Sequence, residues 1–149
     1  MVQRVPIKES TFKETSEGGV LLASRCKSCG QILFPKATIC FSCFSDNMQE
    51  LPLSRRGKLY SYTIGRMPSL HFLPPYAVGF INMPEGVRIF APLKLEESEY
   101  KQLRIGMEME VVIEKLWEEV EKAKEPGGKD IIKEIIGWRF KSVIQGGSL

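Results

Sequence analysis

The chain has 149 residues, of which 43% are hydrophobic and 26% charged. This composition excludes wholesale disorder and leaves room for one ordinary domain, or for a small module joined to a second domain. The formal net charge of +3 is too small for a dedicated nucleic-acid binder. No apolar run approaches the roughly 20 residues of a membrane span, and the first residues, MVQRVPIKESTFK, lack a secretory signal, so we expect a cytoplasmic protein with no membrane partner.

The first fifty residues predict a helical segment followed by a small β-rich module. Residues 7–17, IKESTFKETSE, surround one aromatic side chain with polar groups and end at two glycines, as the C-terminus of a short helix would. VLLASRC and QILFPKATIC are short apolar strands on either side of the first cysteine pair. LPLSRR, residues 51–56, is polar enough to be a linker. We therefore expect an N-terminal helical segment over residues 1–19 and a separate module over residues 20–50.

Repeated strands are predicted from residue 57 onward. GKLYSYTIGRM is followed by YAVGFINM and VRIFAPL, two apolar runs around the turn PEG. A short helix is expected over residues 96–104, and after it Met107, Met109, Val111 and Ile113 recur with a period of two. IIKEIIGWRFKSVI is the last strand. Five strands with a short helix between the third and the fourth fit an OB-type barrel over residues 51–149.

The charged segment EKLWEEVEKAKEPGGK, residues 114–129, fits two structures. It can be a charged helix, or the distal strands of a long hairpin that turns at EPGG. Strands are predicted on both sides of it, which favours the hairpin. Glu118, Glu119 and Glu121 are most simply a solvated face.

All four cysteines lie in one stretch with the spacing C-x2-C-x10-C-x2-C. Each C-x2-C pair can form a tight knuckle, and two facing knuckles supply the four thiolates of a tetrahedral zinc site. Gly30 suits the first knuckle because glycine tolerates positive φ, whereas Phe44 stands at the matching position of the second, and we expect it to pack against the neighbouring domain. Four thiolates leave no open position for water or substrate, so such a zinc ion is structural. The predicted metal ligands are Cys26, Cys29, Cys40 and Cys43.

Three other chemistries remain open for these cysteines. A thioredoxin-like redox pair is disfavoured because it uses a single C-x2-C beside a βαβ unit. Two disulfides are disfavoured in a reducing compartment, and iron held by four thiolates cannot be told from zinc by spacing. A module of about 30 residues is below the size at which a hydrophobic core alone usually suffices, which favours a bound metal.

No catalytic constellation is recognisable in the sequence. His71, the only histidine, sits in the proline-bounded loop MPSLHFLPPY with no acid nearby, and GxSxG, HExxH and phosphate-binding glycine motifs are absent. We therefore expect no catalytic residues in this chain and interpret His71 as an exposed or partner-contacting loop residue.

The ordered set of motifs resembles the family known as domain of unknown function 35, which is associated with acyl-CoA enzymes. RCKSCGQILFPKATICFSC, GKLYSYTIG and above all PPYAVGFINMPEGVRIFAPL carry the resemblance, together with LRIGMEMEVVIE and GWRF. It implies a mainly β fold with a short N-terminal helix, a rubredoxin-like zinc ribbon and a C-terminal five-stranded OB-fold barrel. It also implies a small, non-catalytic subunit that docks on a thiolase-type catalytic subunit in a hetero-oligomer and meets CoA or acyl-CoA through that complex.

In such a complex this chain would supply docking surface and part of the wall of the CoA channel. Candidate contacts for CoA phosphates are basic residues around the first barrel strand, Arg55, Arg56, Lys58 and Arg66, although a solvated patch or linker is the simpler interpretation. Phe72 and Tyr76 are candidate partner contacts because neighbouring prolines would rigidify and expose them, although barrel packing explains them equally well.

The main alternative is a nucleic-acid-binding OB module. The bases of the bound nucleic acid would stack on four aromatic side chains of the predicted strands, Tyr60, Tyr62, Phe80 and Phe90. These side chains are more simply explained as barrel core. Residues 94–125 carry 6 basic and 10 acidic groups, which works against a nucleic-acid groove. An independent acyl-CoA carrier is a third possibility, disfavoured because a lone small barrel encloses little volume for so long a ligand.

Overall fold

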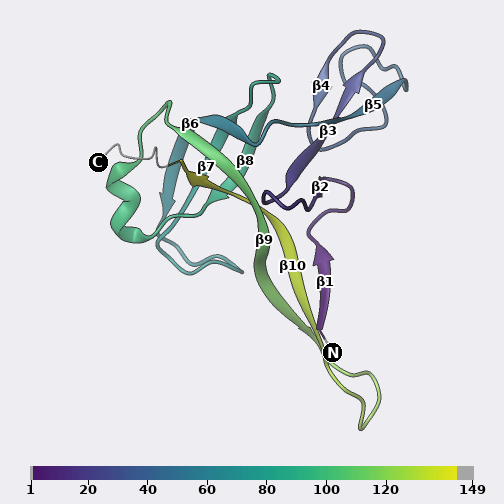
Figure 1. Cartoon of the computed structure of the whole chain (residues 1–149). Coiled ribbons are helices and arrows are strands. Elements are labelled where there is room, and N and C mark those ends of the chain that lie inside the picture. The colour runs from purple at the N-terminus through teal and green to yellow at the C-terminus, as the bar shows by residue number, and fades with distance from the viewer. Residues whose placement is uncertain (1, 144–149) are drawn as a thin grey trace.

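The structure is a computed structural model that describes residues 2–143, in which strands dominate (Figure 1). Residue 1 and residues 144–149, which belong to the first and last predicted domains, lie outside the described part of the chain. The elements in chain order are β1 (Val2–Pro6), β2 (Phe12–Lys13), β3 (Val20–Cys26), β4 (Ile32–Leu33), β5 (Met48–Pro52), β6 (Arg56–Gly65), β7 (Tyr76–Asn82), β8 (Arg88–Leu93), the 3-10 helix η1 (Glu97–Gln102), β9 (Glu108–Glu121) and β10 (Ile131–Ser142).

The ribbon is built around β3, which pairs antiparallel with β2, β4 and β5. Leu21 and Ala23 of β3 are fully buried and belong to the same hydrophobic cluster as the barrel interior. Phe34 of the ribbon packs edge-on against Trp138 of β10, with ring centroids 5.5 Å apart. The ribbon is therefore held to the barrel by shared apolar packing and not only by the chain connection.

Five strands close the barrel. β6, β7 and β8 form an antiparallel meander, β9 pairs with β6, and β10 closes the ring by pairing antiparallel with β9 and parallel with β8 at Phe140. Because side chains alternate across each strand, one set fills the interior; its fully or almost fully buried members include Leu59, Ile81, Ile89, Met109, Val111 and Phe140. With η1 between β8 and β9, this order is that of an OB fold. The predicted short helix is confirmed, with a capping box between Glu96 and Glu99.

The hairpin of β9 and β10 continues well beyond the barrel as a projecting arm (Figure 1). The two strands stay paired as far as Glu121 and Ile131, and β1 adds a third strand, parallel to β10, from Val2↔Ile132 to Pro6↔Ile136. We call β1 and residues 115–136 the arm. The extended hairpin predicted for residues 114–129 is thus confirmed, and the helical alternative is wrong.

The predicted N-terminal helix is wrong, because the described residues before β3 contain two strands and no helix. β1 pairs along β10, and the N–H of Ile7 extends that pairing by donating to the Ile136 carbonyl at 2.7 Å. Ser10 has a φ of +62°, which breaks helical geometry, and Phe12 pairs with Leu21. A short polar helix has little stability of its own, so pairing with a partner distant in sequence prevails.

Candidate metal centre and ligand face

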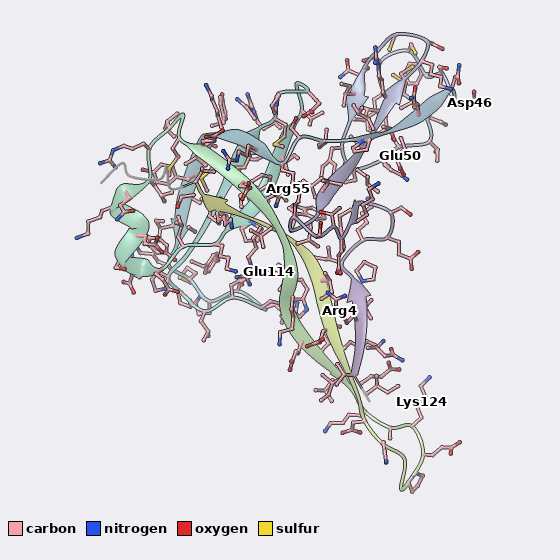
Figure 2. All side chains as sticks on the ribbon, in the orientation of Figure 1. Arg4, Asp46, Glu50, Arg55, Glu114 and Lys124 are labelled. Atoms are coloured by element: carbon pink, nitrogen blue, oxygen red, sulfur yellow. The ribbon has the colours of Figure 1, made fainter. Side chains whose placement is uncertain are left out.

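The four cysteines come together at the end of the ribbon, where Figure 2 shows a group of sulfur atoms. The Sγ atoms of Cys26 and Cys43 are 3.5 Å apart, as are those of Cys29 and Cys40, and all four lie within 4.8 Å of one another. Cys26 and Cys40 are buried, whereas the second cysteine of each pair is exposed. The two C-x2-C pairs therefore face each other, as the spacing predicts.

The two knuckles have the same backbone geometry. The N–H of Gly30 donates to the carbonyl of Cys26 at 2.8 Å, and the N–H of Phe44 donates to the carbonyl of Cys40 at 2.9 Å. Each donor residue follows the second cysteine of its pair and has a positive φ, +84° at Gly30 and +62° at Phe44. The knuckle thus requires a left-handed residue at this position, which glycine adopts freely and phenylalanine does not.

Backbone N–H groups stabilise the thiolate at the first cysteine of each knuckle. The N–H groups of Cys29 and of the residue before it lower the pKa of Cys26 to about 6, against the opposing effect of burial. The N–H of Cys43 leads the corresponding lowering of the pKa of Cys40. At Cys29 the N–H of Gln31 also favours the thiolate, but Cys40, burial and the remaining sulfurs raise its pKa to about 12. Sulfurs this close cannot all carry charge without a cation among them.

The sulfur positions fit a metal ion bound by four thiolates. Zinc bonds to sulfur at about 2.3 Å and so places four tetrahedral sulfurs about 3.8 Å from one another. Two of the sulfur pairs are 3.5 Å apart and all four atoms lie within 4.8 Å of one another, which agrees with that geometry. All four cysteines are free, which contradicts the disulfide alternative. Four thiolates complete the tetrahedron, so the centre has no open position for a substrate.

Phe44 does not pack against the barrel, and the prediction that it would is wrong. Its side chain is 78% exposed, and Phe41 in the same knuckle is 74% exposed. The contact between ribbon and barrel is made by Phe34 instead. The strained φ of Phe44 is therefore not compensated by burial within this chain.

A second candidate site lies on the barrel, between the loop of residues 66–75, the outer side of β7 and β8, and the arm. Side chains there form an open groove of about 540 Å³, which we call the apolar groove. OB folds bind ligands on the face of their second and third strands, between the loop after the first strand and the loop between the last two. The groove occupies that position. Its lining includes Leu70, Phe72, Tyr76, Val78, Phe90, Pro92, Leu116, Trp117 and Trp138.

His71 packs the loop of residues 66–75 against the arm. Its imidazole stacks on the indole of Trp117, with centroids 3.9 Å apart and an interplanar angle of 4°, while Phe72 meets the same indole edge-on at 6.1 Å. Within residues 2–143 no hydrogen bond reaches the imidazole of His71, so it lacks the orienting carboxylate that a general base needs. Its role in this structure is to hold the loop in place.

Tyr60, Tyr62, Phe80 and Phe90 point outward, so their interpretation as barrel core is wrong. They are between 39% and 54% exposed, while Leu59 and Ile81 fill the interior. Phe80 and Phe90 pair across β7 and β8 with centroids 5.2 Å apart. An aromatic stripe therefore extends from the apolar groove along the barrel surface.

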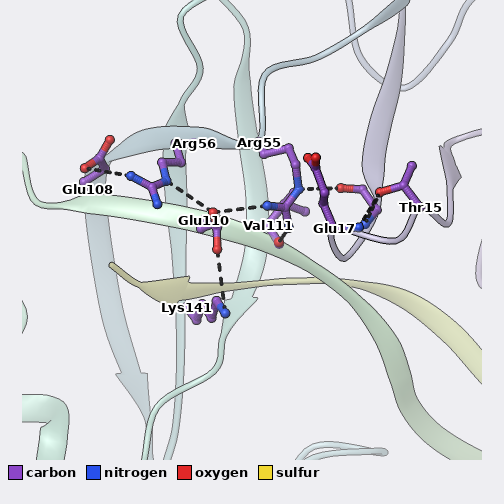
Figure 3. A network of polar contacts seen from close by, with 9 residues as sticks. Thr15, Glu17, Arg55, Arg56, Glu108, Glu110, Val111 and Lys141 are labelled. Carbon is purple, nitrogen blue, oxygen red and sulfur yellow. Dashed lines mark hydrogen bonds and ion pairs between the residues drawn. The ribbon is translucent and has the colours of Figure 1, made fainter. Parts of the chain in front are cut away.

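Arg55 sits inside a polar network that joins the ribbon, the barrel and the N-terminal segment (Figure 3). Its guanidinium donates to the carbonyls of Gly19 and Val111 at 3.0 Å each and to Glu110 at 3.1 Å. Glu110, which is 15% exposed, also pairs with Arg56 at 3.2 Å and with Lys141 at 3.6 Å. Burial opposes ionisation of Glu110, but these cations outweigh it and lower its pKa. In this structure Arg55 and Arg56 are engaged by the chain itself.

The other two predicted basic contacts, Lys58 and Arg66, lie at opposite ends of β6. Lys58 pairs with Asn82 and Gly65, next to Arg66, pairs with Tyr76, so the four basic residues do not form one cluster. Neither side chain joins an ion pair in the part of the chain that the structure describes. Phe72 and Tyr76, in contrast, come together in the groove with ring centroids 5.8 Å apart.

Comparison with known proteins places both halves of the fold in one family. Residues 19–49 match the family described as ChsH2, rubredoxin-like zinc ribbon domain, and residues 50–114 match ChsH2, C-terminal OB-fold domain. A DUF35 domain-containing scaffold protein of Methanothermobacter thermautotrophicus is 32% identical over 114 residues, which is 74% of this chain and 84% of that protein. The chain belongs to the DUF35 family. The fold class predicted from the sequence, a mainly β chain with a zinc ribbon and an OB barrel, is thereby confirmed.

The chain is also similar to two further proteins. Benzoylsuccinyl-CoA thiolase subunit BbsA of Thauera aromatica is 47% identical over 70 residues. The match covers 47% of this chain and spans about half, 49%, of that relative. This similarity agrees with the motifs of the sequence, which also resemble the small zinc-binding subunit of that thiolase. The solved structure named Ltp2-ChsH2(DUF35) aldolase has a TM-score of 0.64 at 21% identity and covers 84% of this chain and 86% of that one, which shows a common fold.

Sequence reasoning did not anticipate the arm as a three-stranded unit. The match to the OB-fold family ends at residue 114, where the arm begins, and β1 lies before the ribbon match. The available signal was weak, because residues 2–6, VQRVP, hold two β-branched valines three positions apart and no regular alternation. Over residues 2–143, no helix combines the length and hydropathy that a membrane crossing requires.

Proposed function

We propose that this chain is a non-catalytic, zinc-binding accessory subunit of a thiolase-type acyl-CoA enzyme complex. The observation that carries the proposal is the 47% identity, over 70 residues, to a protein named as a subunit of a thiolase. The closed four-thiolate centre and the stacked His71 support a chain that contributes structure and leaves the chemistry to its partner.

In this function the four cysteines hold one structural zinc ion. Cys26, Cys29, Cys40 and Cys43 are its ligands, and the ion supplies rigidity to a module too small to be held by its own core. Thiolates remain available for a metal in a reducing compartment, so we assign the subunit to the cytoplasm.

The chain adds docking surface and part of the wall of the CoA channel, while acyl-CoA is bound by the complex as a whole. Lys58 and Arg66 are the predicted basic contacts that form no ion pair within the described residues. We therefore assign to them, ahead of Arg55 and Arg56, the contacts with CoA phosphates or partner carboxylates.

Co-expression with the thiolase-type protein encoded nearest to this chain's gene tests the proposal. We expect one complex in size-exclusion chromatography, with zinc equimolar to this chain and thiolysis of an acyl-CoA by the complex alone. The proposal is contradicted if this chain, at micromolar concentration, elutes separately from each thiolase-type protein with which it is co-expressed.

A nucleic-acid-binding OB module is the second candidate, because Tyr60, Tyr62, Phe80 and Phe90 face outward on the OB ligand face. This function predicts tight binding of a single-stranded oligonucleotide by the isolated chain, weakened steeply by salt. Fluorescence anisotropy with a labelled oligonucleotide at two salt concentrations distinguishes the candidates.

A further inference from the structure

The loop of residues 66–75 presents large apolar side chains directly to solvent. Leu70 is 91% exposed, Leu73 86% and Met67 76%. The loop is nevertheless well fixed, because Ser69 and Phe72 exchange hydrogen bonds of 3.0 to 3.3 Å and His71 stacks on the arm. Its apolar groups are therefore pre-organised for contact, which lowers the entropy lost on binding.

The loop is continuous with the apolar groove and the aromatic stripe. Tyr76 and Phe90 line the groove, and the stripe passes through Phe80 to Tyr60. β7, which carries Tyr76 of the groove and Phe80 of the stripe, is about 20 Å long from Tyr76 to Asn82 at the usual rise of a strand. We call the loop, the groove and the stripe together the docking face. Exposed apolar surfaces of this extent on a folded chain mark interaction sites.

The charges of the docking face lie at its two ends. Arg66 follows Gly65, which pairs with Tyr76 at one end, and Lys58, Asn82 and Arg88 form one cross-strand row at the other. Arg88 lies over the ring of Tyr60 at 3.5 Å. Within residues 2–143 these three cations form no ion pair, whereas Lys94, Arg139 and Lys141 beside the face are paired with Glu114 or Glu110.

We infer that the docking face is the surface that binds the catalytic subunit of the complex, with Leu70 and Leu73 as its anchors. The inference rests on the proposed function and adds the place of contact. The partner surface that fits is an apolar hollow for the two leucines, bordered by carboxylates that meet Arg66 at one end and Lys58 and Arg88 at the other. Central apolar anchors with a charged rim are the usual anatomy of a protein interface.

A protein surface fits this face better than a small ligand or a nucleic acid does. A small molecule in the groove cannot cover Leu73 and Met67, because these side chains are 86% and 76% exposed and do not line the groove. Aliphatic side chains do not stack on bases as aromatic rings do. A nucleic acid also needs cations along its whole path, and here the unpaired cations stand only at the ends.

The test measures the affinity of the full-length chain for the thiolase-type subunit with which it forms a complex. Leu70→Ala and Leu73→Ala change exposed side chains, so folding is unaffected, which circular dichroism and zinc content verify. Each is expected to weaken binding about 30-fold or more, as an interface anchor does. Ile105→Ala, at a residue 63% exposed outside the docking face, is the matched control and leaves the affinity unchanged, as does Phe41→Ala on the ribbon.

The outcomes separate this inference from the proposed function. A complex that is weakened by the two leucine variants and not by the controls supports it, as does slowed hydrogen exchange of residues 66–75 in the complex. A complex of unchanged affinity in both leucine variants, or one weakened only by Phe41→Ala, overturns the docking face and leaves the proposed function standing. A wild-type chain that binds an oligonucleotide and no thiolase-type subunit overturns both.

Discussion

Replacing Phe44 with glycine is expected to stabilise the ribbon although it removes a large side chain. A residue with a Cβ atom held in left-handed geometry costs about 1–2 kcal/mol, and Phe44 has a φ of +62°. Glycine also has more conformational freedom in the unfolded chain, which reduces this stabilisation by about 0.4–1 kcal/mol. Little packing is lost because the side chain is 78% exposed. The net gain is about 0.5–1 kcal/mol, equivalent to zinc binding about two- to fivefold tighter.

Gly30 provides the matched control for this prediction. It holds the same place in the other knuckle at a φ of +84°, and a Cβ atom added there has no heavy atom within 4 Å. Gly30→Ala therefore introduces backbone strain without a clash, and we expect it to weaken zinc binding by a similar factor. Competition with a chromophoric chelator measures both affinities on the full-length chain. Weaker zinc binding by Phe44→Gly would refute the reasoning, because it would mean that the side chain stabilises the ribbon by contacts within the chain.

Three further changes test the metal centre, the polar network and the barrel core. Cys29→Ser is expected to abolish stoichiometric zinc binding while Ser28→Ala keeps it, as metal analysis of the purified proteins would reveal. Glu110→Gln should lower stability by about 1–3 kcal/mol near neutral pH, since three cations lose their common carboxylate. The folded-state pKa of Glu110 is lowered, so its ion pairs contribute fully to the free energy of unfolding above about pH 4.3, the usual carboxyl value. That contribution disappears as the pH falls through the folded pKa. Denaturant titrations at several pH values should therefore show that the variant loses less stability in acid than the wild-type chain does. Phe140→Ala, at a fully buried position, should cost about 3–5 kcal/mol in the same assay.

The parts of this structure that sequence predicts are those set by short-range patterns. The spacing of the cysteines determines that two knuckles can face each other, and the turn at Pro84, Glu85 and Gly86 joins two apolar runs that form β7 and β8. The hairpin of residues 114–129 was predicted because strands lead into it from both sides. Each of these features depends on residues close together in the chain, so the pattern carries the information.

The parts that sequence did not predict depend on distant partners. β1 is a strand because β10, about 130 residues later, offers a free edge, and nothing in residues 2–6 identifies that partner. Arg55 was assigned to a surface, but its guanidinium reaches Glu110 across 55 positions. Local composition cannot distinguish an exposed arginine from one that joins two parts of a fold.

The sequence also did not show which side chains of each strand point into the barrel and which point to solvent. A period of two shows that Leu59 and Tyr60 face opposite sides, but not which side is the interior, and an aromatic ring is compatible with either. In the structure a bulge between Leu59 and Ser61 also shifts the register of β6 against β7. The outward aromatic stripe and the exposed leucines of the loop, on which the docking face depends, therefore become visible only in three dimensions.

Native mass spectrometry of the complex captured through a tag on this chain tests the central claim most directly, combined with a thiolysis assay of the same sample. The account predicts a hetero-oligomer of this chain with a thiolase-type subunit, zinc equimolar to this chain, and acyl-CoA thiolysis that the isolated chain lacks. A free monomer without such a subunit, or thiolysis by the isolated chain, would contradict it.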